Sequence, residues 1–264
     1  LTAGWSGKQQ VFDRSRMGNE TSFGLGFSGN EMIGKFVAGN DFNYVQAHAT
    51  SIAASGKYNI SSCSSEVIAS GRVQMKNYQA VDLINGLERH DGYTHAFFKS
   101  FTPALQNSIR QYASQGGRIL ISGSYTGSDM QTEEEQAFLS DILKLSYEPT
   151  GSTAITRDIN PEDSTVTERD SIVYTSPNVK GLGLKFSYYN ELNAQHYAAT
   201  HPEILKPVGN YAFTAMQYDT GTSAAVAYKS TTYRSFVMGF PLECIIDEST
   251  RTSVLLGILK FLTD

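Results

Sequence analysis

The feature that most constrains the fold is a regular alternation of apolar segments with amphipathic segments in the first half of the chain. The runs Ala80–Gly86 (AVDLING) and Arg118–Gly123 (RILISG) have the composition of buried strands. Between them, Thr102–Gln115 repeats apolar residues on one helical face and begins with Thr-Pro, a cap followed by the proline that suits a first helical position. This order predicts a mainly parallel sheet covered by helices on both faces.

Other segments of the chain fit the same α/β pattern. A capping box opens the segment Thr132–Leu145, where Thr132 and Glu135 have the required spacing. The remaining strands are expected at Met32–Gly39 and Tyr58–Ser64, and the remaining helices at Phe42–Gly56, Ser64–Gly71 and Glu248–Leu262.

The pattern changes after Pro149. Residues 150–210 are polar and contain three prolines, so we expect an insertion-like irregular segment with short β pieces, and residues 1–31 are also expected to be irregular. From Ala212 onward, period-2 alternation predicts three antiparallel neighbours, at 212–218, 223–229 and 233–240. We interpret residues 1–264 as a single domain, a flavodoxin-like three-layer sandwich with an antiparallel extension in its C-terminal half.

Composition limits the classes of partner. With a net charge of −5 and no basic patch, the chain is not expected to bind nucleic acid, and its apolar runs are too short to span a membrane. Its 15 tyrosines and 23 glycines are typical of secreted carbohydrate-associated proteins, so we expect an extracytoplasmic chain whose signal was removed before Leu1. Cys63 and Cys244 match no metal motif, and we expect them not to be bonded to each other.

The segment Gly123–Gly127 (GSYTG) follows a buried strand and has the form of a nucleophile elbow, in which the middle residue carries the reactive group. That residue is Tyr125, a phenol that makes a poor nucleophile unless its pKa is lowered or a base lies beside it. Ser124 lies one position early, and the histidines do not follow the order expected for a serine hydrolase. We therefore interpret Ser124 as a small residue at a tight strand end, with a serine nucleophile as the weaker alternative.

Two further strand ends carry carboxylates. Glu88 ends NGLE and Glu243 ends GFPLE. Ligands of open α/β sheets bind at the carboxyl ends of the strands, so these ends are expected to share one crevice with the elbow. The candidate crevice residues are Glu88, Ser124, Tyr125, Asp129 and Glu243. A Glu88–Glu243 pair about 5 to 9 Å apart would permit glycoside hydrolysis; otherwise one glutamate caps a helix and the other faces solvent.

Histidines cluster in two places. The segment 88–95 (ERHDGYTH) holds His90 and His95, and the segment 196–203 (HYAATHPE) holds His196 and His201. Neither spacing aims the side chains at a common point, so we expect solvated loops with no metal, and the sequence indicates no cofactor.

The order of these strand ends resembles the class I glutamine amidotransferase-like family. That family carries a cysteine in G-x-C-x-G and a histidine and glutamate in F-H-P-E. The corresponding positions are Tyr125 for the cysteine, Pro241 for the histidine and Glu243 for the glutamate. The resemblance therefore implies a fold whose amidotransferase chemistry has been lost.

A longer resemblance covers most of the chain. The stretches FVAGNDFNYVQAHATSIAASG, YQAVDLINGLE, FTPALQNSIRQYASQGGRILISGSYTGSD and GTSAAVAYKSTTYRSFVMGFPLECI are similar to secreted bacterial modules labelled "xanthan lyase". Authentic xanthan lyases are built on helical toroids, which this strand–helix alternation does not resemble, so we adopt the fold and not the activity. The family pattern also implies a first strand upstream of residue 1.

These resemblances lead to two functional hypotheses. The first is a non-catalytic, degenerate amidotransferase-like module that binds polysaccharide or neighbouring modules of a larger chain. The alternative is a carbohydrate-active hydrolase or lyase that uses Glu88, Glu243 and Tyr125 in the crevice.

Overall fold

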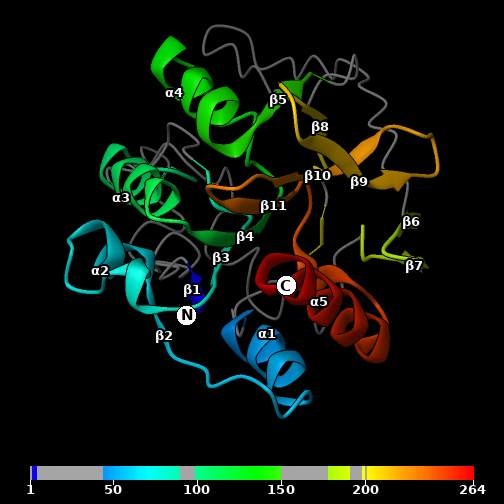
Figure 1. Ribbon diagram of the computed structural model, residues 1–264. Coiled ribbons are helices and arrows are strands. Elements are labelled where there is room, and N and C mark those ends of the chain that lie inside the picture. Colours follow the sequence, from blue (N-terminus) through cyan, green and yellow to red (C-terminus); the bar gives the residue numbers. More distant parts are fainter. Residues whose placement is uncertain (1, 5–43, 90–98, 150–177, 191–197, 200) are drawn as a thin grey trace, which may run out of the picture.

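A computed structural model describes residues 2–4, 44–89, 99–149, 178–190, 198–199 and 201–264. They form a mixed α/β structure around a nine-stranded sheet with the order β2-β1-β3-β4-β11-β10-β9-β6-β7, beside a two-stranded sheet β5-β8 (Figure 1). The strands are β1 Thr2–Gly4, β2 Ser62–Ser64, β3 Val81–Gly86, β4 Arg118–Gly123, β5 Leu145–Glu148, β6 Asn178–Gly181, β7 Leu184–Ser187, β8 Ile204–Pro207, β9 Ala212–Tyr218, β10 Ser223–Lys229 and β11 Arg234–Met238.

Helices cover both faces of the sheet. They are α1 Tyr44–Ala53, α2 Ser65–Ala69, α3 Pro103–Ser114, α4 Glu133–Phe138 and α5 Glu248–Thr263, with short turns η2 Met75–Asn77, η3 Leu139–Leu143 and η4 Leu242–Cys244. Figure 1 shows α1 beside α5, while α2, α3 and α4 lie elsewhere around the sheet. The α/β class expected from the alternation is therefore confirmed.

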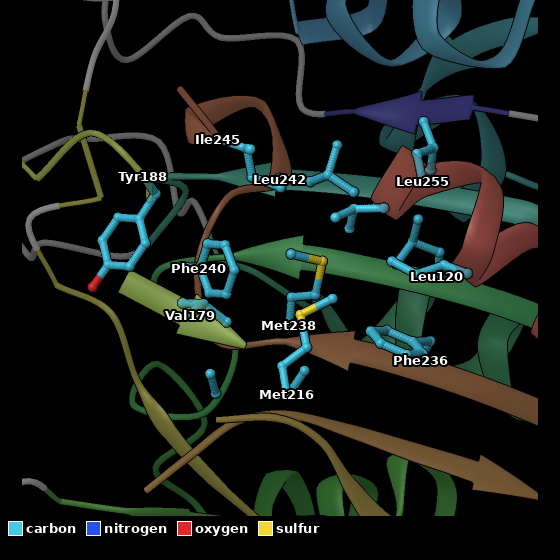
Figure 2. Close-up of a cluster of buried hydrophobic side chains, with 14 of the residues drawn as sticks. Leu120, Val179, Tyr188, Met216, Phe236, Met238, Phe240, Leu242, Ile245 and Leu255 are labelled. Carbon is cyan, nitrogen blue, oxygen red and sulfur yellow. The ribbon is translucent and has the colours of Figure 1, made fainter. Parts of the chain in front are cut away.

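Strand alternation divides the core into two clusters. On β4, Leu120 belongs to the cluster under α1 and α5, whereas its neighbours Ile119 and Ile121 belong to the cluster under α2, α3 and α4. Figure 2 shows the first cluster, in which Leu120, Phe236 and Met238 of the sheet lie near Leu242, Ile245 and Leu255. Because both faces of β3 and β4 are buried, apolar residues stand next to one another in these strands, as at 83–84 and 119–121.

The sheet has a parallel half and an antiparallel half. Strands β2, β1, β3, β4 and β11 are parallel neighbours. Strand β10 pairs antiparallel with β11 and β9, and β6 continues the antiparallel half. The antiparallel extension predicted from the period-2 segments is confirmed.

Most predicted elements form close to their expected bounds, and three predictions need comment. Residues 1–31 were expected to be irregular, with a first strand upstream of residue 1. Instead, Thr2–Gly4 form the strand β1, which pairs with β2 on one side and β3 on the other. The strand expected at Tyr58–Ser64 shortens to Ser62–Ser64. The strand expected at Met32–Gly39 lies outside the described residues.

The N-terminal caps follow the sequence signals. The Thr102 side chain accepts a hydrogen bond from the Leu105 amide, and Pro103 takes the first position of α3. At α4, Thr132 and Glu135 form the reciprocal capping box. The helix expected up to Leu145 instead passes from α4 into the π-helical turn η3, which ends at Lys144 in the left-handed region (φ 58°).

Removing the Thr102 cap tests how much this local signal stabilises the fold. We expect Thr102→Ala to lower the free energy of unfolding by about 1 kcal/mol, because the Leu105 amide loses its acceptor. Urea unfolding measures the change, and Thr102→Ser, which keeps the hydroxyl, is the control. Equal losses in the two variants would show that the hydroxyl is not what stabilises the start of α3.

Candidate functional site

The carboxyl ends of β3, β4 and β11 lie at one edge of the sheet. Ile84 of β3 and Met238 of β11 both pair with Ser122 of β4, in parallel register. This confirms the predicted convergence of these strand ends. We call the group formed by Glu88, Arg89, Tyr125, Asp129, His201 and Glu203 the rim cluster.

Tyr125, at the centre of the elbow, does have a histidine beside it. Its hydroxyl lies 2.8 Å from Nδ1 of His201, and the guanidinium of Arg89 lies 4.6 Å from the centroid of its ring. Burial raises the pKa of Tyr125 to about 12, although Arg89 opposes the rise. An imidazole therefore lies beside this phenol, because residues 201–203 fold back onto the edge of the sheet.

The surroundings of His201 make its imidazole a weaker base than a free histidine. Burial, with the positive charge of Arg89, lowers the pKa of His201 below its ordinary value. The imidazole is thus neutral at pH 7, and its Nδ1 shares a hydrogen bond with the Tyr125 hydroxyl, in which the tautomer of the imidazole decides the donor. The pair consists of a protonated phenol and a neutral imidazole, so Tyr125 gains orientation from His201 but no nucleophilic character.

Ser124 is enclosed by the strand end. Its side chain is fully buried, and its Oγ has no hydrogen-bond partner among the described residues. Its amide donates to the Gly86 carbonyl (2.8 Å). A Cβ on Gly123 would lie 2.8 Å from Cβ of Asn85, so the β3 and β4 ends approach too closely for a larger residue. The interpretation of Ser124 as a small residue at a tight strand end agrees with this packing.

Glu203 is a rim residue that the sequence reasoning missed. Its carboxylate accepts hydrogen bonds from the amides of Gly127 (2.6 Å) and Ser128 (2.8 Å), directly after the elbow. Burial raises the pKa of Glu203 to about 7, against the lowering effect of these donors. Glu203 belongs to the polar segment 150–210, where no periodicity marks a buried carboxylate.

Asp129 and Glu88 are linked to the elbow through Ser100. Asp129 accepts a hydrogen bond from the Ser100 amide (2.8 Å), and the Ser100 hydroxyl donates to the carbonyls of Glu88 and Tyr125. Burial, together with the negative charges of Glu66 and Asp129, raises the pKa of Glu88 to about 9. Glu88 is therefore a neutral carboxylic acid at pH 7.

Glu243, the remaining predicted crevice residue, belongs to a different cluster. Its Oε2 lies 3.2 Å from Nε2 of His48, whose Nδ1 lies 2.7 Å from Oδ2 of Asp82. We call these three residues the buried trio. The structure groups Glu88 with Asp129 and Glu243 with His48, and the hypothesised Glu88–Glu243 carboxylate pair stays a prediction.

The buried trio joins three elements on the α1–α5 face of the sheet. His48 comes from α1, Asp82 from β3 and Glu243 from η4, and all three side chains are buried. Burial alone would lower the pKa of His48, but Asp82 and Glu243 outweigh it and raise that pKa to about 10. A buried imidazolium held by two carboxylates on both nitrogens has no free nitrogen for proton transfer, so the arrangement is structural.

Some predicted residues are not part of either cluster. His90, His95 and His196 lie outside the described residues. Cys63 on β2 and Cys244 in η4 are both thiols, as expected, with no disulfide between them. Within the described ranges, no group of three or more His, Cys, Asp or Glu side chains is arranged to hold a metal ion, and no helix is long and apolar enough to cross a membrane.

Comparison with known proteins gives only distant similarity. No family model matches the chain, and no curated protein matches it. Among solved structures, a β-galactosidase from Halorubrum lacusprofundi is 13% identical with a TM-score of 0.47, and the match covers 91% of this chain and 28% of the β-galactosidase. The chain thus spans less than a third of the length of that glycosidase.

Two smaller structures match over most of their length. A ThuA-like protein from Parabacteroides merdae is 12% identical with a TM-score of 0.48 and 85% coverage of both chains. A GMP synthase component from Thermoplasma acidophilum is 9% identical with a TM-score of 0.40, and the match covers 76% of this chain and 81% of that one. These low values assign neither a family nor an activity.

The buried imidazolium makes stability depend on pH. Its folded pKa of about 10 exceeds the ordinary value of 6.5. The stabilisation is therefore complete below about pH 6.5 and is lost as the pH rises toward 10, by at most about 1.4 kcal/mol per pH unit. We expect urea unfolding of the wild type to show this decline between pH 7 and 9.5, and His48→Gln to show a smaller one.

Glu88 and Glu203 also titrate with raised pKa values, so the comparison of wild type with His48→Gln isolates the contribution of His48. Imidazole NMR of the folded wild type gives an independent reading. A His48 resonance that titrates near pH 6.5 would contradict the assignment of a buried imidazolium.

Proposed function

We propose that this chain is a non-catalytic, degenerate amidotransferase-like module of an extracytoplasmic protein, which binds polysaccharide at its rim cluster. The observation that carries the proposal is the state of Tyr125. A residue with a raised pKa, hydrogen-bonded to a neutral histidine, stands where the resembling family keeps its nucleophile. Burial of Ser124 supports the same conclusion, since its hydroxyl is enclosed by the strand end.

The strand order supports the fold part of this proposal. The parallel half has the order β2-β1-β3-β4-β11, which corresponds to the flavodoxin-like order 2-1-3-4-5 when β11 is counted as the fifth strand. In such sheets, ligands bind outside the carboxyl ends of the strands. The rim cluster occupies that edge, and it takes residues from the β3 end, the elbow and the segment before β8.

The chemistry of the rim suits a hydroxyl-rich ligand. Tyr125 is partly exposed, and an aromatic ring can stack on the apolar face of a sugar. Glu88, as a neutral acid, can donate a hydrogen bond to a hydroxyl group, and the exposed Arg89 guanidinium supplies further donors. The cluster therefore offers both stacking and hydrogen bonding without an activated nucleophile.

Affinity electrophoresis in gels containing xanthan or dextran tests the binding role. We expect one of these polysaccharides to retard the protein, and Tyr125→Ala to weaken the retardation roughly tenfold through loss of the ring. Tyr211→Ala is the matched control, because Tyr211 is a tyrosine with 72% of its surface exposed. It accepts a hydrogen bond from the Lys229 amide, and Lys229 pairs with Arg234 at the start of β11, so Tyr211 lies at the edge of the sheet opposite the rim cluster. Equal retardation of the two variants would remove Tyr125 from the binding surface.

The non-catalytic part of the proposal has a separate test. We expect the purified chain to show no turnover of glutamine, ester or xanthan substrates, and Tyr125→Phe and Ser124→Ala to change nothing. A turnover that persists through purification and disappears in either variant would contradict the proposal.

Glu88 supports the alternative, a carbohydrate-active hydrolase or lyase. A protonated carboxylic acid near a second carboxyl group, here Asp129, is the arrangement that a glycosidase uses for its general acid. If xanthan or a related polysaccharide is cleaved, Glu88→Gln should lower the rate by about 10²–10⁴-fold. An unchanged rate would exclude Glu88 as the acid.

A further inference from the structure

Arg89 places an exposed positive charge in the rim cluster. Its side chain is open to solvent, and its guanidinium lies 4.6 Å from the centroid of the Tyr125 ring, a contact that holds the cation beside the elbow. No carboxylate among the described residues forms an ion pair with it. A guanidinium carries its N–H donors in a rigid plane and can pair with a carboxylate through two parallel hydrogen bonds. Arg89 therefore offers a ligand a cationic donor group beside an aromatic ring.

The carboxyl groups of the rim cluster are buried, in contrast to Arg89. Glu88 and Asp129 are each 7% exposed, and Glu203 is 4% exposed. Glu203 accepts hydrogen bonds from the two amides after the elbow, and Asp129 accepts one from the Ser100 amide. The pKa of about 9 leaves Glu88 uncharged at pH 7. A ligand that approaches from solvent therefore meets the charge of Arg89 before any of these three carboxyl groups.

The charge of the chain as a whole works against an acidic ligand. The net charge is −5, and Glu66 of α2 is an exposed carboxylate close enough to Glu88 to raise its pKa. Long-range attraction therefore does not draw a polyanion to this protein. A preference for an acidic ligand has to come from direct contact with Arg89, which makes that preference a specific test of this residue.

We propose that the rim cluster binds an acidic polysaccharide, with Arg89 pairing with the carboxylate of a uronic acid unit. This inference rests on the polysaccharide binding proposed above and names the class of ligand. Arg89 covers one face of the Tyr125 ring, so a sugar that stacks on Tyr125 uses the other face. Arg89 and Tyr125 therefore contact different units of the polysaccharide, and the ligand is an oligosaccharide rather than a single uronic acid.

The test compares two oligosaccharides that differ only in charge. Trigalacturonic acid and its fully methyl-esterified form are titrated into the full chain by isothermal titration calorimetry at low ionic strength. We expect the acid to bind roughly tenfold more tightly than the ester, because only the acid can form the charge-assisted pair with Arg89. Equal affinity for the two, tighter binding of the ester or binding of neither would overturn the inference.

A third probe separates recognition of a sugar from recognition of charge alone. Triglutamate carries carboxylates on a peptide and has no sugar ring to stack on Tyr125. We expect it to bind more weakly than trigalacturonic acid. Binding of triglutamate as tight as that of trigalacturonic acid would overturn the choice of a polysaccharide and indicate an acidic peptide.

Variants assign the preference to Arg89. We expect Arg89→Gln to lower the affinity for the acid to that of the ester and to leave the ester unaffected. Arg89→Lys is expected to keep part of the preference, because it retains the charge but loses the planar set of donors. Arg72→Gln is the matched control, since Arg72 is an exposed arginine that follows α2 and whose amide donates to the Val67 carbonyl. Unchanged affinity for the acid in Arg89→Gln, or an equal loss in Arg72→Gln, would overturn the assignment.

Tyr125→Ala distinguishes a failure of this inference from a failure of the proposed function. If acid and ester bind equally and Tyr125→Ala weakens both, the rim cluster binds polysaccharide without recognising a carboxylate, and only the inference is overturned. If the acid is preferred but neither Tyr125→Ala nor Arg89→Gln changes its affinity, the ligand lies away from the rim cluster, and both the inference and the proposed function are overturned.

Discussion

The parallel pairing of β11 with β4 is the interaction on which the rest of the structure depends. It joins Arg234–Met238 to Arg118–Ser122, segments more than a hundred residues apart in the chain. Through it, the antiparallel half of the sheet becomes continuous with the parallel half. It also sets the position of the segment after β11, which supplies Pro241 to the strand end and Glu243 to the buried trio.

This pairing explains why Tyr125 and Glu243, which were expected in one crevice, belong to two different clusters. After Met238, the chain passes over the α1–α5 face, where Phe240 and Leu242 enter the core. Glu243 follows them to His48 rather than to Glu88. Pro241 has no imidazole to offer the elbow. The histidine beside Tyr125 is His201, which belongs to the segment before β8. That segment is held by the Glu203 amide, which donates to the Gly239 carbonyl at the end of β11 (2.7 Å).

Sequence reasoning succeeded where the signal is local. The caps at Thr102 and Thr132, the buried runs of β3 and β4 and the alternation of β9–β11 all depend on neighbouring residues, and all were predicted. His48 was missed because a histidine on the buried face of a helix has no local partner; both of its carboxylates are distant in sequence. The contacts of Glu203 and His201 with the elbow were missed for the same reason, since nothing within 150–210 indicates them and His201 was expected in a solvated loop.

Among the described residues, the main sheet ends in a short strand on each side, which has a consequence for association. β2 has three residues and β7 has four, and β7 includes Lys185. Short edges that carry charge offer little backbone for another strand to pair with. A partner that docks on this sheet therefore gains few main-chain hydrogen bonds, and its specificity has to come from side chains. The short edge strands disfavour both the addition of a strand from a partner and edge-to-edge aggregation.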